Sequence, residues 1–174
     1  DECEQENIRI VKVSEKVFKA MSYRDRPDGF IAVFNTRDLS LPDKINGPIL
    51  IPDQIEKPGN LGTMIRTAKS FGINNIFLSD EITDIFNPNV IRASIGHVFN
   101  MNIWSSSNNK IRDFLNSNNY QILLLDPEGE ESLENFKPEN NFAVVVGAEQ
   151  YGISNEWFEN EYVALSIRST NNVD

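Results

Sequence analysis

The sequence predicts an α/β domain with a mainly parallel sheet flanked by helices. Short runs that are apolar on both faces alternate with helical patterns from about residue 48 onward, which is typical of parallel strands covered on both sides. The chain has 174 residues, 40% of them hydrophobic, and this is enough for one sizeable core. Every apolar run is far shorter than the ~18 residues that span a bilayer, so we expect no membrane partner.

The predicted strands are short runs rich in Ile, Val, Leu and Phe. They are Phe30 to Phe34, Ile49 to Ile51, Ile76 to Leu78, Ile122 to Leu125, Phe142 to Val146 and Tyr162 to Ile167.

The predicted helices lie between these strands. Thr63 to Phe71 places its apolar residues on one stripe, and Gly72 follows where the end of a helix favours a left-handed residue. Asn87 and Pro88 predict a cap and a first turn. The remaining predicted helices are Pro88 to Ile95, Lys110 to Ser117, a short one after Ser154 and the amphipathic stretch Val13 to Met21.

Composition and charge exclude several classes of protein. With 16 Lys+Arg against 26 Asp+Glu, the formal charge is -10, which argues against coating nucleic acid through a broad basic face but allows a local basic patch. Cys3 is the single cysteine, so a disulfide framework is excluded and a reducing compartment is favoured. The first residues are acidic and unlike a signal peptide, so we expect a cytoplasmic protein.

The glycine positions exclude two nucleotide sites. No two glycines are separated by a single residue, so the G-x-G-x-x-G dinucleotide fingerprint is absent. Gly147 and Gly152 have the spacing of a P-loop, but Ile153 stands where the phosphate-binding lysine is required.

Two loops that directly follow strands hold the candidate site residues. In the first, Gly59 and Gly62 are expected to let the backbone turn sharply before a helix, with Asn60 at the turn and Arg66 four positions after Gly62. The second, Gly147 to Gly152, places Glu149 at the carboxyl end of a strand, the edge where open α/β sheets bind ligands. From residue types alone, a capping Asn, a solvated Arg and a Glu that ties down its own loop fit about as well.

Together, these segments resemble the SpoU/TrmH family of RNA 2′-O-ribose methyltransferases in the SPOUT superfamily. The resemblance covers residues 48–174 and rests on Pro58-Gly59-Asn60-Leu61-Gly62 through Arg66-Thr67-Ala68, on Arg92-Ala93-Ser94-Ile95-Gly96, and on Gly147-Ala148-Glu149-Gln150-Tyr151-Gly152-Ile153-Ser154. It implies a SPOUT-type fold whose C-terminal segment threads a trefoil knot, an exception to the rule that chains avoid knots. The family's next motif is expected directly after Asp174, so the knot-completing segment is expected to be absent from the given chain.

The resemblance also implies an activity and its site. The activity is S-adenosylmethionine-dependent methylation of a ribose 2′-hydroxyl in rRNA or tRNA by a homodimer. The implied catalytic residues are Asn60, Arg66 and Glu149, with Asn60 holding either Arg66 or the ribose. The implied cofactor-binding residues are Gly147, Gly152 and Ile167, and the implied RNA-binding residues are Arg66, Arg92 and Ser94. A catalytically silent RNA-binding or small-ligand-binding relative on the same fold is the alternative.

Arg66 is expected to orient the hydroxyl or a neighbouring phosphate and to stabilise developing negative charge. Its pKa above about 12 makes it a poor base. Because phosphate contacts need cations, basic residues should gather on one face: Arg24, Arg26, Arg37, Arg66, Lys69, Arg92 and Arg168.

The resemblance further implies a division of the chain. Residues 1–46 would be the end of an N-terminal substrate-binding domain plus a linker from Leu39 to Gly47, and residues 47–174 a C-terminally incomplete methyltransferase domain. His97 has no second His or Cys beside it, so no metal site is expected. The aromatic residues Phe71, Phe99, Trp104 and Trp157 are expected in the core or in a subunit interface.

Overall fold

The computed structural model describes residues 9–23, 29–139, 141–159 and 161–167. The chain forms two compact units, Asp1–Thr36 and Arg37–Asp174. In the described part of the first unit, the regular element is helix α2 (Glu15–Met21), whose N-cap Ser14 accepts a hydrogen bond from the Val17 N–H. The strand predicted for Phe30 to Phe34 is wrong, because this run has no regular structure and no neighbouring strand to pair with among the described residues.

The second unit is built on a seven-stranded sheet in the order β3-β2-β1-β6-β4-β7-β5. Every pair of neighbouring strands is parallel, as predicted. The strands are β1 (Ile49–Pro52), β2 (Asn75–Ser79), β3 (Asn102–Ser106), β4 (Gln121–Leu125), β5 (Glu131–Ser132), β6 (Phe142–Val146) and β7 (Val163–Ser166). The sequence analysis missed β3, which is half polar, and β5, which is two residues long.

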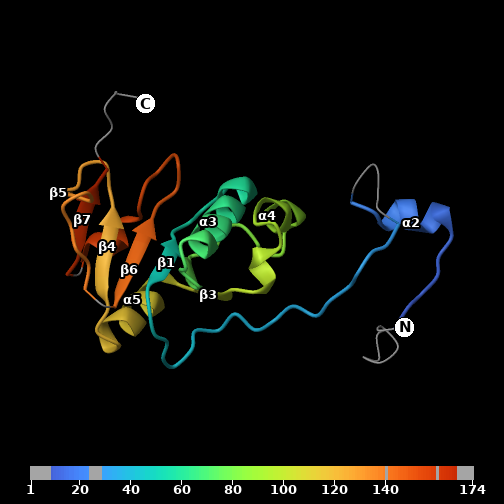
Figure 1. Ribbon diagram of the computed structural model, residues 1–174, viewed down its shortest axis with the longest axis horizontal. Helices are drawn as coiled ribbons and strands as arrows, with labels where there is room; N and C mark the ends of the chain where they lie inside the picture. The colour runs from blue at the N-terminus through green and yellow to red at the C-terminus, as the bar shows by residue number, and fades with distance from the viewer. Residues whose placement is uncertain (1–8, 24–28, 140, 160, 168–174) are drawn as a thin grey trace. The chain divides into compact units, whose positions relative to one another are not determined.

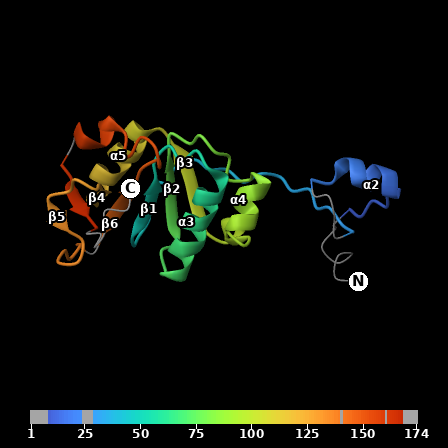
Figure 2. The same ribbon diagram turned by 90° about the horizontal axis from the view of Figure 1, so that it is seen from above.

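Helices cover both faces of the sheet (Figures 1 and 2). Helices α3 (Pro58–Ser70) and α4 (Pro88–Ala93) lie on one face, and α5 (Asn108–Ser117) lies on the other. Side chains along β2 alternate between the two layers. Phe77 packs in a cluster with Ile111 and Leu115 of α5, whereas Ile76 and Leu78 pack with the apolar residues of α3. The 3-10 helices η1 (His97–Phe99) and η2 (Asn155–Glu159) complete the described helical elements of this unit.

Helix α3 begins earlier than the sequence analysis predicted. It starts at Pro58, so the segment Pro58 to Gly62 forms the first turns of a helix and is not a loop. The role expected for Gly62 is therefore wrong. A Cβ atom at Gly62 would lie 2.5 Å from the Ala93 Cβ and 2.7 Å from the Val90 carbonyl oxygen. Gly62 is required because α3 packs closely against α4, not because the chain turns there.

Other predicted helix ends agree better with the structure. Gly72 follows α3 with a φ of +78°, as predicted for a residue beyond a helix C-terminus. The Asn87 side chain accepts a hydrogen bond of 2.9 Å from the Asn89 N–H and caps α4. Trp157 is buried as expected, whereas Phe71 and Phe99 are largely exposed and are not core residues.

The segment expected as a linker, Leu39 to Gly47, is held against the sheet, together with Arg37 just before it. The Arg37 guanidinium donates hydrogen bonds to the carbonyls of Met101 (2.7 Å) and Val98 (3.3 Å). The Ser105 N–H donates to the Leu39 carbonyl (2.8 Å). Arg37 is partly buried, which lowers its pKa, and its guanidinium is used in these two hydrogen bonds. It therefore stabilises the fold and is not one of the free cations expected on the basic face.

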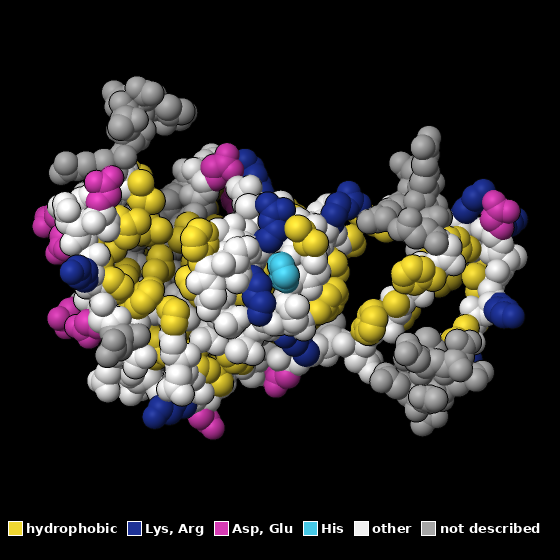
Figure 3. Space-filling view, in the orientation of Figure 1, with side chains coloured by type: hydrophobic (Ala, Val, Ile, Leu, Met, Phe, Trp, Pro, Cys, Tyr) yellow, Lys and Arg dark blue, Asp and Glu magenta, His cyan; other side chains and the backbone are white. Residues whose placement is uncertain are grey.

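Part of the sheet presents an apolar face beside α3. Leu123 of β4 is in register with Val144 of β6 and Val163 of β7, so these side chains share one face. Figure 3 shows hydrophobic side chains gathered over β4, β6 and β7, and no described helix covers them in Figure 1. The segment on which the predicted knot depends was expected after Asp174 and lies outside the described residues. Among the described helices, none combines the length and the hydrophobicity that crossing a membrane requires.

Candidate active site

A cavity of about 560 Å³ lies at the carboxyl ends of β1 and β6. The first turns of α3 form one wall, and the loop after β6 forms the other. The lining residues are Ile55, Glu56, Lys57, Asn60, Thr63, Met64, Val146, Gly147, Glu149 and Gln150. Its volume is within the range of about 300–1,000 Å³ that is typical of ligand sites, and it lies at the edge where α/β sheets bind ligands.

Three side chains meet at this cavity. The Asn60 amide donates a hydrogen bond of 3.0 Å to Glu149 Oε2, and Lys57 Nζ lies 2.7 Å from the same oxygen. The hydrogen bond from Lys57, then the one from Asn60, and finally the Lys57 charge lower the pKa of Glu149. The site therefore holds Glu149 as a carboxylate and as an acceptor.

The sequence analysis did not single out Lys57. The residue occupies the N-cap of α3, directly before Pro58. A cation at this end of a helix is unfavourable next to the helix dipole. An acidic partner for Lys57 would offset this, but the sequence analysis began the helix at Thr63, six positions later, so the signal could not be read from the sequence.

Arg66 lies apart from the other two predicted catalytic residues. It is on α3, is exposed, and does not line the cavity. Its side chain forms no hydrogen bond or ion pair with the described residues, and the Asn60 amide is directed to Glu149 instead. The structure thus brings Asn60 and Glu149 together and leaves the Arg66 guanidinium available to an external group.

Basic side chains do gather over α3 and α4. Figure 3 shows dark blue Lys and Arg side chains around the histidine, His97, on this face. Arg66 and Lys69 belong to α3 and Arg92 to α4. The segment between β4 and β6 has the opposite charge, with Glu128, Glu130, Glu131, Glu134 and Glu139. The remaining cations expected on the basic face, Arg24, Arg26 and Arg168, lie outside the described residues, as does Cys3.

Ser94 does not lie where RNA could reach it. The residue is 0% exposed, and its hydroxyl donates a hydrogen bond of 3.0 Å to the Ile91 carbonyl. Arg92 is exposed on the same short helix. Of the two RNA-contacting candidates in this segment, only Arg92 is accessible.

The loop after β6 is closed by its own backbone. Ala148 and Gly152 exchange two hydrogen bonds of 2.9 Å, and Gly152 has a φ of +69°. A Cβ atom at Gly147 would lie 2.1 Å from the Gly152 carbonyl carbon. Gly147 is one of the predicted cofactor-binding residues, and in the structure its missing side chain allows the two sides of the loop to approach each other closely.

The sheet order places two predicted cofactor-binding residues near one another. Strands β6, β4 and β7 are neighbours, so Gly147 and Ile167 flank the loop that follows β4. That loop, Asp126 to Gly129, was not singled out from the sequence. A Cβ atom at Gly129 would lie 2.6 Å from the backbone of Leu165. At this edge of the sheet the backbones of neighbouring loops lie close together, and Ile167 is 66% exposed. Such an edge suits a small ligand that is held mainly by backbone groups.

No cluster of His, Cys, Asp and Glu that could hold a metal ion occurs within the described ranges. The single histidine, His97, lies in η1. The polar groups at the cavity are an amide, an ammonium and a carboxylate, and this set suits hydrogen bonding and charge stabilisation.

The parallel sheet, with an Asn and a Glu brought together at its carboxyl edge, defines an α/β protein with a candidate ligand site at that edge. The SpoU rRNA Methylase family matches residues 47–174, and the chain belongs to this family.

Known relatives agree with this assignment. The chain is 27% identical over 162 residues to the 23S rRNA (guanosine(2553)-2′-O)-methyltransferase RlmP of Bacillus subtilis, covering 91% of this chain and 64% of RlmP. An AdoMet-bound rRNA methyltransferase from Sinorhizobium meliloti superposes with a TM-score of 0.81 at 25% identity, over 92% of this chain and 63% of that one. A TrmH-family RNA methyltransferase from Porphyromonas gingivalis, described as putative, gives 0.79 at 27% identity, over 90% and 63%. The chain thus spans less than two thirds of the length of these relatives.

Proposed function

We propose that this SpoU domain transfers a methyl group from S-adenosylmethionine to a ribose 2′-hydroxyl of rRNA or tRNA. The observation that carries the proposal is the 3.0 Å hydrogen bond between Asn60 and Glu149 at the wall of the cavity. It joins two separate family motifs in one site. Two of the relatives named above, the rRNA 2′-O-methyltransferase of Bacillus subtilis and the AdoMet-bound rRNA methyltransferase of Sinorhizobium meliloti, support the reaction and favour rRNA.

The described residues suit distinct roles in this reaction. When bound, S-adenosylmethionine supplies an electrophilic methyl group on sulfur, and backbone groups at Gly147, Gly152 and Ile167 would hold it. The 2′-hydroxyl oxygen would gain the methyl group as the carbon–sulfur bond breaks and S-adenosylhomocysteine leaves, and it would lose its proton to a phosphate oxygen or water. Because Arg66 is exposed and unengaged, it can orient that hydroxyl or a neighbouring phosphate and stabilise developing negative charge.

Asn60 and Glu149 act at the wall of the cavity. Their hydrogen bond links α3, which also carries Arg66, to the loop that begins at Gly147. Correct alignment of the reacting groups supplies much of the rate in such transfers. We assign Asn60 and Glu149 to this alignment, and Arg66 and Arg92 to the RNA backbone.

The assembly and location of the protein are part of the proposal. We infer a homodimer, and the half-buried Val144, Val146 and Val163 on the apolar sheet face support it, since a second subunit can cover such a face. Residues 1–46 would belong to an N-terminal substrate-binding domain and its linker. We place the protein in the cytoplasm, in keeping with an RNA substrate and a single cysteine.

Methyl transfer by the full-length protein tests the proposal. Ribosomal RNA or tRNA that lacks its own modifications would be incubated with S-adenosylmethionine labelled in the methyl group and then hydrolysed in alkali. A 2′-O-methyl group blocks alkaline cleavage at its nucleotide, so we expect the label in alkali-resistant dinucleotides. Label in mononucleotides, on a base, would contradict the proposal. RNA binding without any transfer would favour the catalytically silent alternative.

A further inference from the structure

A buried carboxylate outside the predicted site holds both ends of the loop that carries Glu149. Asp53 directly follows β1 and is 0% exposed. Its backbone N–H donates a hydrogen bond of 2.9 Å to the Val146 carbonyl, at the last residue before the loop. Its side-chain Oδ2 accepts a hydrogen bond of 2.8 Å from the Ser154 N–H, where the loop ends.

The other side-chain oxygen of Asp53 is anchored to the neighbouring strand. Oδ1 accepts a hydrogen bond of 2.7 Å from the Ser79 hydroxyl at the end of β2. The two backbones are also bridged there, and the Gln54 N–H donates a hydrogen bond of 3.0 Å to the Ser79 carbonyl. The carboxylate is therefore held between the ends of β1 and β2. Because it is fixed there, it also fixes the position of the Ser154 N–H that it binds.

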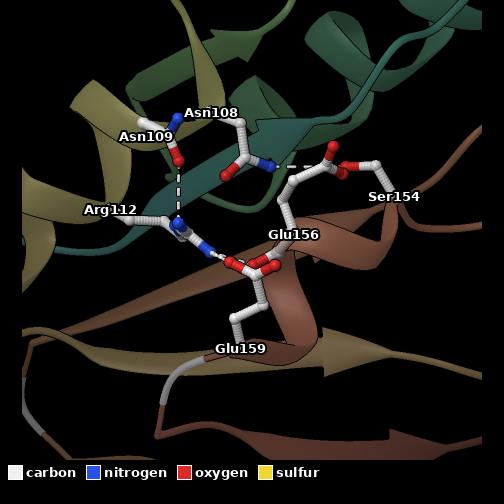
Figure 4. Close-up of polar contacts among 6 residues, drawn as sticks. All are labelled: Asn108, Asn109, Arg112, Ser154, Glu156 and Glu159. Carbon is white, nitrogen blue, oxygen red and sulfur yellow. Dashed lines mark hydrogen bonds and ion pairs between the residues drawn. The ribbon is translucent and has the colours of Figure 1, made fainter.

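Helix α5 supports the same end of the loop (Figure 4). The Asn108 amide donates a hydrogen bond of 3.3 Å to the Ser154 hydroxyl. One turn further along, the Arg112 guanidinium donates to the Glu156 carbonyl and contacts the Glu159 carboxylate at 3.4 Å. Ser154 and the η2 turn are thus anchored to α5, and they hold the end of the loop in place.

We propose that Asp53 is a positioning residue, which sets the place of Glu149 through the loop between Val146 and Ser154. The loop itself is closed by the Ala148–Gly152 hydrogen bonds, so holding its two ends determines its orientation as a unit. Asp53 acts on the loop through Ser154 and through its own backbone contact with Val146. The kinetic part of the test rests on the proposed methyl transfer, whereas the loop measurement does not.

The first arm of the test uses the full-length Asp53→Ala variant. Losing the carboxylate frees the Ser154 end of the loop, and misplacement of a site by about 1 Å can cost about a hundredfold in rate. We expect a loss of about that size in kcat/KM for methyl transfer. The Ala148 and Gly152 amides should also exchange with deuterium faster, whether or not the protein is active.

Asn75→Ala is the matched structural control. Asn75 is also a buried polar residue, whose amide donates to the Asn46 and Pro48 carbonyls and accepts from the Asn102 amide, but it lies at the amino end of β2. If Asp53 were only a stability element, the two variants would lose thermal stability and activity in the same proportion. We expect Asn75→Ala to lower the thermal midpoint while keeping near-normal kcat and normal exchange at Ala148 and Gly152.

Asp53→Asn keeps the proposal testable if Asp53→Ala does not fold. The amide oxygen can accept from the Ser154 N–H while the amide NH2 donates to the Ser79 hydroxyl, which can accept as well as donate. We expect activity within about threefold of wild type, as the geometry of the two bonds is kept. An inactive but folded Asp53→Asn, or a folded Asp53→Ala with normal exchange at Ala148 and Gly152, would overturn the proposal.

An inactive wild-type protein would contradict the proposed function alone. The exchange comparison between Asp53→Ala and Asn75→Ala would still decide whether Asp53 orients the loop.

Discussion

Asn60 and Glu149 are 89 residues apart in the sequence, and their side chains meet at a hydrogen-bond distance of 3.0 Å. The contact follows from the sheet order, since β1 and β6 are parallel neighbours and the segments after their carboxyl ends emerge side by side. Arg66, on the same helix as Asn60, stays exposed. The site thus combines the hydrogen-bonded pair Asn60 and Glu149 with a separate, exposed cation, Arg66.

Arg66→Ala should abolish methyl transfer by the full-length protein. The exposed guanidinium is the group available to the RNA, and loss of one well-placed electrostatic donor costs about 10²–10³ in rate. S-adenosylmethionine affinity, measured by calorimetry, should change little, since Arg66 does not line the cavity. Wild-type-like turnover in this variant would contradict the role assigned to Arg66.

Lys110→Ala is the matched control for charge. Lys110 is an exposed cation on α5, across the sheet from α3. Its removal should leave kcat within about twofold of wild type, because exposed charges far from a site are screened by salt. An equal loss in both variants would indicate nonspecific attraction of RNA.

Lys57→Ala should raise the pKa of Glu149 toward its ordinary value. Lys57 is the first cause of the lowered pKa, and Asn60 is the second, so Asn60→Ala should raise it less. Because the folded-state pKa is lowered, the stabilising contribution of this carboxylate is present above the ordinary carboxyl range. It is lost as the pH falls through the lowered pKa. Titration of the Glu149 carboxyl carbon by NMR measures both shifts.

Lys69→Ala provides the control for this titration. Lys69 is another lysine of α3, but its ammonium contacts Asn74 at 2.8 Å and not Glu149. The Glu149 titration should be unchanged in this variant. An unchanged titration in Lys57→Ala as well would show that the Lys57–Glu149 contact is absent in solution.

Gly62→Ala should destabilise the domain by about 1–3 kcal/mol, the cost of overpacking a tight contact. The added methyl group would collide with Ala93 and with the Val90 carbonyl of α4. Gly59→Ala is the control, since nothing lies within 4 Å of its Cβ position. Alanine is a better helix former than glycine, so this change should be neutral or stabilising by up to about 1 kcal/mol. Urea denaturation of both variants gives the comparison, and equal effects would argue against close α3–α4 packing.

The full-length protein should be a dimer at micromolar concentration. The physical reason is the apolar sheet face that includes the half-buried Val144 and Val163, because a self-complementary contact would remove their remaining apolar area from water. Light scattering after size exclusion measures the mass directly. A monomer that retains methyl transfer would contradict the dimer.

Several parts of the fold could be predicted because their signals are local. Phe142 to Val146 reads as a strand from a few consecutive apolar residues, and Asn87-Pro88 reads as a helix start. The edge strand β3 was missed because Ser105 and Ser106 resemble a loop when their pairing with β2 is unknown. The run Phe30 to Phe34 gave the opposite error, since β-propensity without a partner strand does not make a strand.

By itself, the sequence determined the alternation of strands and helices and the motifs that contain Asn60, Arg66 and Glu149. Only the tertiary structure decided that Asn60 pairs with Glu149, that Lys57 joins them, and that Asp53 holds both ends of the loop. The physical reason is that helix and strand propensities depend on near neighbours in the chain. These contacts instead join residues 89 to 101 positions apart, and they exist because the sheet places β1 beside β6.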